Sequence, residues 1–103
     1  MAEIVWSDPA LSDLDAIADF IALENPAAAS ALIQRVFTHI EQLADFPESG
    51  SYPPELGPSR YRQIVEPPCR IFYRYHSKTV FILHVMRAER LLREGLLTSR
   101  TQP

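Results

Sequence analysis

The sequence predicts an α+β fold in which an antiparallel sheet packs against an N-terminal helical hairpin, with a short helical tail at the C-terminus. Three observations predict it. Apolar residues recur at helical spacing through residues 11–44, runs rich in β-branched and aromatic residues fill residues 60–86, and a proline-rich stretch separates the two regions. The expected order is β-α-α-β-β-β, within a single domain that covers residues 1–103.

The first strand and the first helix are predicted from residues 4–21. Residues 4–6 (Ile-Val-Trp) form a short apolar stretch that ends at Ser7. Asp8 suits an N-cap, and Pro9 suits the first helical position. Apolar residues then follow at spacings of three and four, which indicates one buried helix face. They are Leu11, Leu14, Ile17, Ala18 and Ile21.

The second helix has the same start signal at Asn25-Pro26 and ends before Pro47. Its apolar stripe runs for about four turns. The stripe comprises Ala29, Leu32, Ile33, Val36, Phe37, Ile40, Leu43 and Ala44. Because so few residues join the two helices, they must fold back as a hairpin, and their broad apolar faces need a further layer to cover them.

Residues 47–59 carry four prolines and two glycines, which indicates a loop that is long for a compact domain and therefore functional or mobile. Three predicted strands follow, at residues 60–66, 69–75 and 79–86. Their short links favour an antiparallel meander. The last strand is apolar on both faces, which is typical of the centre of a sheet.

Residues 87–97 are expected to form the helical tail, with its leucines on one side and Arg87, Arg90 and Arg93 on another. Two interpretations stay open for this segment. The tail covers the sheet edge, or its arginines help it contact a target. Deletion of residues 91–103 separates them, because only a structural tail is needed for stability.

Charge is distributed unevenly along a chain of net charge −3. Residues 1–55 hold ten acids and one base, whereas residues 56–103 hold nine bases, eight of them arginine, and three acids. The acidic net charge argues against a surface that grips nucleic acid over its whole extent. The charge split leaves open a local basic surface for an acidic partner or a phosphate.

Several classes of protein are excluded by composition. Cys69 is the single cysteine, so no intrachain disulfide or cysteine-cluster zinc site can form. The histidines His39, His76 and His84 show no metal-ligand spacing. No apolar run approaches the roughly 20 residues of a membrane-spanning helix, and the N-terminus does not resemble a signal peptide. We expect a small soluble protein of the cytosol, without metal, cofactor or membrane association.

Catalytic groups are hard to find in the sequence. Neither Cys69 nor His84 has a neighbouring group that would make it a nucleophile or a base, and His84 lies in an apolar strand. The chain has no GxSxG motif and no glycine-rich phosphate loop. The aspartates of the first helix (Asp13, Asp15 and Asp19) lie off its apolar stripe, so we expect them to face water.

The arginines are the better candidates for function. Arg60 and Arg62, like Arg70 and Arg74, have even spacing within predicted strands, so each pair projects to one face of its strand. One interpretation is a solvated sheet face with no specific role. The other is a basic binding surface opposite the acidic helices.

The chain resembles the RelE/ParE superfamily of type II toxin–antitoxin toxins. The matching features run in order over nearly the whole length, and their order and spacing carry the resemblance. They are residues 6–10 (WSDPA), 14–21 (LDAIADFI), 25–29 (NPAAA), 43–47 (LADFP) with Gly50, 60–64 (RYRQI), 69–74 (CRIFYR) and 80–87 (VFILHVMR). The resemblance implies a small sheet with an N-terminal helical hairpin, and an antitoxin wrapped around it.

The resemblance implies one of two activities. RelE-like toxins cleave mRNA on the ribosome with basic side chains and a histidine or tyrosine after the last strand. Residues 87–90 (Arg-Ala-Glu-Arg) contain neither, although Arg62 and Arg87 match arginine positions shared widely in the superfamily. The chain looks more like the ParE branch, whose members inhibit DNA gyrase without known catalysis of their own.

The leading hypothesis is therefore a bacterial cytoplasmic toxin that inhibits DNA gyrase and is neutralised by a cognate antitoxin in a hetero-oligomer. It has no catalytic residue and no direct sequence-specific contact with nucleic acid. Its expected target-binding residues are Arg62, Arg87, Arg90 and Arg93. One alternative is a ribosome-dependent mRNA endoribonuclease that uses Arg62 and Arg87. Another is a degenerate, non-toxic binding module.

Overall fold

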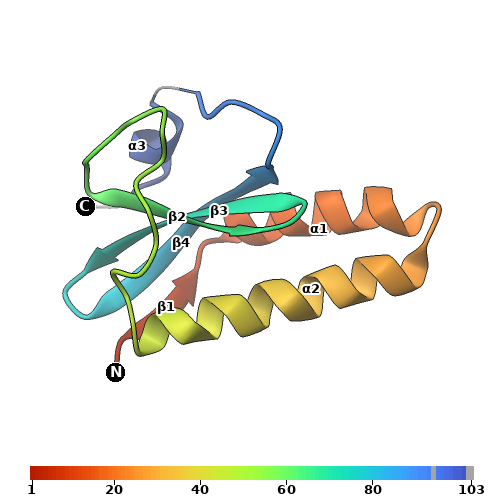
Figure 1. Ribbon diagram of the computed structural model, residues 1–103, viewed down its shortest axis with the longest axis horizontal. Coiled ribbons are helices and arrows are strands. Elements are labelled where there is room, and N and C mark those ends of the chain that lie inside the picture. Colours follow the sequence, from red (N-terminus) through yellow and green to blue (C-terminus); the bar gives the residue numbers. More distant parts are fainter. Residues whose placement is uncertain (94, 102–103) are drawn as a thin grey trace.

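The computed structural model describes residues 1–93 and 95–101. Two long helices cover one face of a four-stranded sheet, and a short C-terminal helix lies against the other (Figure 1). The elements are β1 (Glu3–Trp6), α1 (Asp8–Ala22), α2 (Pro26–Glu41), the 3₁₀ turn η1 (Gln42–Ala44), β2 (Tyr61–Glu66), β3 (Cys69–His76), β4 (Thr79–Arg87) and α3 (Leu96–Arg100). The predicted α+β class and the order of elements are confirmed.

The sheet has the strand order β1-β4-β3-β2, with β2, β3 and β4 antiparallel and β4 inside the sheet, as predicted. The first strand departs from the predicted antiparallel arrangement, because β1 pairs with β4 in parallel. The helical hairpin explains this direction. It returns the chain to the start of β1, where Ala2 N–H donates to Ala44 O at 2.8 Å, so β2 begins at the same end of the sheet as β1. After two reversals of direction β4 runs the same way as β1.

Both helices begin at capping side chains. Ser7, rather than the predicted Asp8, is the N-cap of α1, and its hydroxyl accepts from Ala10 N–H at 3.2 Å. Asn25 caps α2 as predicted, through a bond from Ala28 N–H to its side-chain oxygen at 3.1 Å. Each cap satisfies an N–H that the first turn of a helix leaves free.

Two apolar clusters hold the fold together, one on each face of the sheet. The first lies between the helical hairpin and the sheet, and includes the fully buried Val36, Ile71 and Ile82. The second lies on the opposite face, where Leu92 and Leu97 of the C-terminal segment pack on Phe72 of β3. The C-terminal segment is therefore part of the packed structure.

The predicted helix over residues 87–97 was wrong in position. Arg87 is the last residue of β4, and residues 88–93 leave the strand without forming a helix, with Arg90 N–H donating to Arg87 O at 3.1 Å. The helix begins only after Gly95, whose φ of 85° belongs to the left-handed region that glycine adopts without strain. Residue 94 lies outside the described residues. The predicted alignment of Arg87, Arg90 and Arg93 on one helix face therefore does not occur.

Within residues 1–93 and 95–101, no helix combines the length and the apolar character needed to cross a bilayer. That same part of the chain contains no cluster of three or more His, Cys, Asp or Glu side chains suited to a metal ion.

The packing of the tail predicts a structural cost for its loss. Leu97 is 3% exposed and Leu91 is 83% exposed. We expect Leu97→Ala to lower the free energy of unfolding by about 2–4 kcal/mol, and Leu91→Ala to change it by less than about 0.5 kcal/mol. Deletion of residues 91–103 removes Leu92 as well and is expected to cost more than Leu97→Ala. Urea unfolding measures each variant, and equal stability of the two leucine variants would contradict the packing.

Candidate functional site

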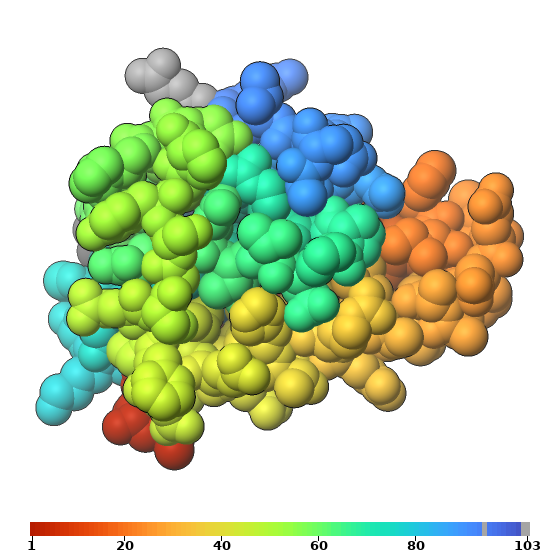
Figure 2. Space-filling view, viewed as in Figure 1, coloured from red at the N-terminus to blue at the C-terminus, as the bar shows by residue number. Residues whose placement is uncertain are grey.

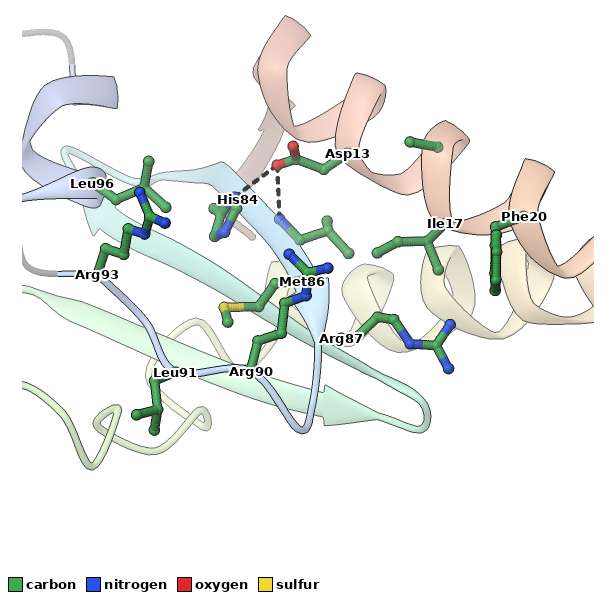
Figure 3. Close-up of a pocket in the computed structure, with 12 residues that line it drawn as sticks. Asp13, Ile17, Phe20, His84, Met86, Arg87, Arg90, Leu91, Arg93 and Leu96 are labelled. Carbon is green, nitrogen blue, oxygen red and sulfur yellow. Dashed lines mark hydrogen bonds and ion pairs between the residues drawn. The ribbon is translucent and has the colours of Figure 1, made fainter.

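A groove of about 610 Å³ lies between α1, the end of β4 and the C-terminal segment (Figure 3). We call it the α1–β4 groove. Its lining residues are Asp13, Ala16, Ile17 and Phe20 of α1, His84, Val85, Met86 and Arg87 of β4, and Arg90, Leu91, Arg93 and Leu96 after it.

The floor of the groove exists because β4 is longer than its neighbour β1. Strand β1 pairs only as far as Trp6 opposite Ile82, and β4 continues to Arg87. Side chains replace the missing strand just beyond that point. Asp13 Oδ2 accepts from Val85 N–H at 3.2 Å, and Arg100 Nη1 donates to Leu83 O at 3.0 Å. Helices α1 and α3 are thereby fastened to the same edge of the sheet.

Asp13, His84 and Arg100 form a compact network at this edge. Arg100 Nη1 donates to Asp13 Oδ2 at 2.6 Å, and His84 Nδ1 lies 2.7 Å from the same oxygen. Burial opposes ionisation of Asp13, but hydrogen bonds from His84 and Arg100 outweigh it, so the pKa of this carboxyl lies below its ordinary value. The prediction that Asp13 faces water was wrong. His84 is largely buried, as expected, and its ring stacks on Phe72.

Three of the four predicted target-binding residues meet in the groove. Arg87, Arg90 and Arg93 line it together, although they do not share a helix. Arg87 Nε bonds Glu89 at 3.0 Å, whereas its Nη1 is buried without a hydrogen-bond partner among the described residues. Exposed apolar side chains flank these cations, with Phe20 68% exposed on one wall and Leu91 83% exposed on the other. The groove combines apolar walls with positive charge.

Arg62 lies elsewhere, at the start of the edge strand β2, while Arg87 lies at the end of β4. Its guanidinium donates to Gly50 O at 2.9 Å and to Tyr52 Oη at 3.3 Å, and lies over the Tyr52 ring. Gly50 is required there, because a Cβ at this position would approach Tyr73 Oη to 2.6 Å. In this structure Arg62 holds the long loop against the sheet.

Sequence reasoning missed a second polar cluster, which is centred on Arg70. This buried guanidinium forms a double ion pair with Glu55 at 2.7 and 2.8 Å, and contacts Gln63 Oε1 at 2.8 and 3.0 Å. Arg70 also donates to Arg90 O at 3.1 Å, and Glu55 accepts from Leu92 N–H at 2.9 Å. The cluster thus fixes both the long loop and the segment that carries Arg90. In Figure 2 that loop (yellow-green) and the C-terminal segment (blue) are both visible on the face toward the viewer, the loop along the left and the C-terminal segment across the top.

The other candidate residues, Arg74, Arg60 and Cys69, do not line the groove. Arg74 is buried, and its guanidinium lies 5.7 Å from the centre of the Phe81 ring. Arg70 and Arg74 project to the same face of β3, as predicted, but this face is buried and is not exposed to solvent. Arg60 lies over the ring of Tyr61, away from the groove. Cys69 is fully buried, and burial raises the pKa of its thiol, which leaves it unsuited to nucleophilic attack.

The groove is therefore suited to binding. Its titratable groups, Asp13 and His84, are occupied in fastening Arg100 and the β4 backbone. A nucleophile with a placed base is not found among the described residues that line it. Positive charge and exposed apolar surface together suit an acidic partner that also carries apolar side chains.

Comparisons with known proteins agree on one family. Residues 4–92 match the family described as the ParE toxin of the type II toxin–antitoxin system parDE. Among similar proteins, Toxin RelE2 of Caulobacter vibrioides is 37% identical over 92 residues, which are 88% of this chain and all of the relative. Putative toxin Y4kP of Sinorhizobium fredii is 36% identical over 85 residues, which are 82% of this chain and 86% of the relative.

One solved structure, described as the chromosomal ParDE TA system from P. aeruginosa, has a similar fold. It superposes with a TM-score of 0.71 at 28% sequence identity, and the match covers 86% of this chain and 98% of the other.

The Glu55–Arg70 ion pair predicts a pH dependence of stability. Hydrogen bonds from Arg70 lower the pKa of the Glu55 carboxyl from 4.5 to about 2. Since the folded value lies below the unfolded one, the pair contributes fully above pH 4.5 and its contribution is lost as the pH falls towards 2. Because Glu55 lies near the surface, where solvent screens the ion pair, Glu55→Gln is expected to cost about 1–2 kcal/mol at neutral pH. Urea unfolding as a function of pH should show a smaller loss of stability in acid for Glu55→Gln than for the wild type, and identical pH profiles would contradict this role.

Proposed function

Because the chain belongs to the ParE toxin family of type II toxin–antitoxin systems, we propose that it arrests growth by binding and inhibiting DNA gyrase. The resemblance to the RelE/ParE superfamily that the sequence predicts is confirmed by these relatives. The proposal places the protein in the bacterial cytoplasm, where gyrase acts.

The observation that carries the proposal is the gathering of Arg87, Arg90 and Arg93 in one apolar groove. Positive charges gathered in a groove attract an acidic surface over a distance. Exposed apolar groups such as Phe20 and Leu91 then supply contact area. Such a groove supports inhibition by binding, without a reaction catalysed by the toxin itself. Arg62, bound to Gly50 and Tyr52, is a weaker candidate for target contact than the sequence suggested.

The name of the relative Toxin RelE2 raises a second candidate, a ribosome-dependent mRNA endoribonuclease. That activity would need Arg62 and Arg87 to act on one phosphate. The two residues lie on different strands at opposite ends of the sheet, since Arg62 pairs with Tyr73 and Arg87 pairs with Cys69. The geometry therefore favours inhibition by binding over cleavage.

An antitoxin is the second expected partner, in a toxin–antitoxin hetero-oligomer. The similar solved structure is described as a ParDE toxin–antitoxin system, which supports this expectation. We place the antitoxin over the α1–β4 groove, because occupation of that groove would cover Arg87, Arg90 and Arg93 at once. Neutralisation would then follow from competition with gyrase for the same residues.

Gyrase assays test the proposal directly. We expect the purified toxin at micromolar concentration to inhibit supercoiling or to cause cleaved DNA to accumulate. The double variant Arg90→Gln/Arg93→Gln is expected to lose at least about ten-fold in potency. The control Arg60→Gln removes an arginine outside the groove and should stay within about two-fold of the wild type.

Unaffected gyrase would contradict the proposal. Mapping of mRNA ends after brief induction separates the candidates, because codon-linked cuts are expected only of an endoribonuclease. Unchanged growth on induction would indicate a degenerate binding module.

Binding of the antitoxin has a thermodynamic signature. A disordered tail that folds onto the groove buries apolar surface of both chains, so the heat-capacity change of binding should be large and negative. Isothermal titration at several temperatures, with a peptide of the antitoxin C-terminal tail, measures it. A heat-capacity change near zero would contradict coupled folding.

A further inference from the structure

The edge of β4 in the groove has backbone groups that no other residue of the described chain pairs with. Ala88 N–H donates to Pro68 O across the β3–β4 ladder, which fixes the alternation of hydrogen bonds along it. Met86 therefore turns its backbone groups towards β3, whereas Val85 and Arg87 turn theirs away, to the side where β1 has already ended. The N–H and C=O groups of Val85 and Arg87 make four backbone groups on this side, and two of them are occupied. Val85 N–H donates to Asp13, and Arg87 O accepts from Arg90 N–H.

The two groups left are Val85 C=O and Arg87 N–H, which have no hydrogen-bond partner among the described residues. The spacing of this C=O and this N–H allows both of them to bond a single residue of a strand that runs parallel to β4. In parallel pairing a single residue donates its N–H to one carbonyl and accepts from the N–H two positions further along the neighbour. A residue of an antiparallel strand would instead form both of its backbone hydrogen bonds with one residue of β4, either Val85 or Arg87. Each of these two residues already has one backbone group occupied. The free edge therefore accepts a strand that runs parallel to β4, in the direction of β1.

Side chains around the edge define the composition of such a strand. Arg87 Nη1 is buried and has no partner among the described residues, and Arg90 and Arg93 add positive charge nearby. A carboxylate on the incoming segment would satisfy Arg87 with a charge-assisted bond. Phe20 and Leu91, both exposed, would cover a large apolar side chain of the segment.

We infer that an extended segment of the antitoxin, carrying at least one acidic and one large apolar residue, adds to the sheet as a short parallel strand beside residues 85–87 of β4. The inference rests on the proposed function, which supplies the antitoxin as partner. Main-chain bonds to Val85 and Arg87 provide affinity, and the carboxylate on Arg87 together with the apolar contact provides specificity.

Amide hydrogen exchange tests the strand addition on the unmodified protein. NMR of isotope-labelled toxin, free and bound to unlabelled full-length antitoxin, reports the Arg87 amide directly. We expect its exchange to slow by at least about ten-fold in the complex. The amide of Lys78, in the turn at the other end of β4, is the internal control and should change little.

Affinity measurements test the side-chain part. Arg87→Gln is expected to weaken antitoxin binding by at least about ten-fold, and Arg60→Gln, which removes an arginine outside the groove, by less than about two-fold.

The outcomes separate this inference from the proposed function. If the antitoxin binds and neutralises the toxin while Arg87 exchange is unchanged, strand addition is overturned and the proposed function stands. If Arg87 is protected at high toxin concentration without antitoxin, the occupant is a second copy of the chain and the assignment to the antitoxin is overturned. Protection by the antitoxin with normal growth and active gyrase would support the inference while contradicting the proposed inhibition of gyrase.

Discussion

Strand β4 extends beyond the strand beside it, and much of the structure follows from how its exposed edge is satisfied. β1 ends opposite Ile82, but β4 continues to Arg87. A partly buried backbone group without a partner costs about 1–3 kcal/mol, so the edge requires substitutes for the missing strand. Asp13 of α1 and Arg100 of α3 supply them, and they also bond each other at 2.6 Å. The two helices that border the groove are therefore fastened at one point, and the remaining edge is unpaired among residues 1–93 and 95–101.

The uneven distribution of charge along the sequence has two consequences in the fold. Ion pairs join the two halves of the chain, and a local basic surface lies in the groove. Acids of the first half pair with arginines of the second half within the fold, as in Glu55–Arg70 and Asp13–Arg100. These internal pairs neutralise some of the arginines. The positive charge of the groove comes from arginines that do not take part in these pairs. Arg90 and Arg93 are held near the groove by the contacts of Glu55 and Arg70 with the backbone of residues 90 and 92.

Local features of the fold could be predicted from the sequence, and long-range ones could not. Helices α1 and α2 follow from apolar spacing and from caps such as Asn25, which act within three residues. The parallel pairing of β1 depends on where the hairpin returns the chain, which no local pattern records. Asp13 looked like a surface residue because its partners, His84 and Arg100, lie 71 and 87 positions away. The groove arginines could be named from composition and family resemblance, but the separation of Arg62 from them depends on the tertiary fold.

A double-mutant cycle on Asp13 and Arg100 tests most directly whether these side chains act together as the substitute for a strand at the β4 edge. The free energies of unfolding of Asp13→Ala, Arg100→Ala and the double variant, measured in urea, give the coupling between the two residues. Because both residues bond each other and adjacent backbone groups of β4, we expect a coupling of at least about 1 kcal/mol, with the double variant less destabilised than the sum of the single ones. Additive effects of the two substitutions would contradict a shared role at this edge.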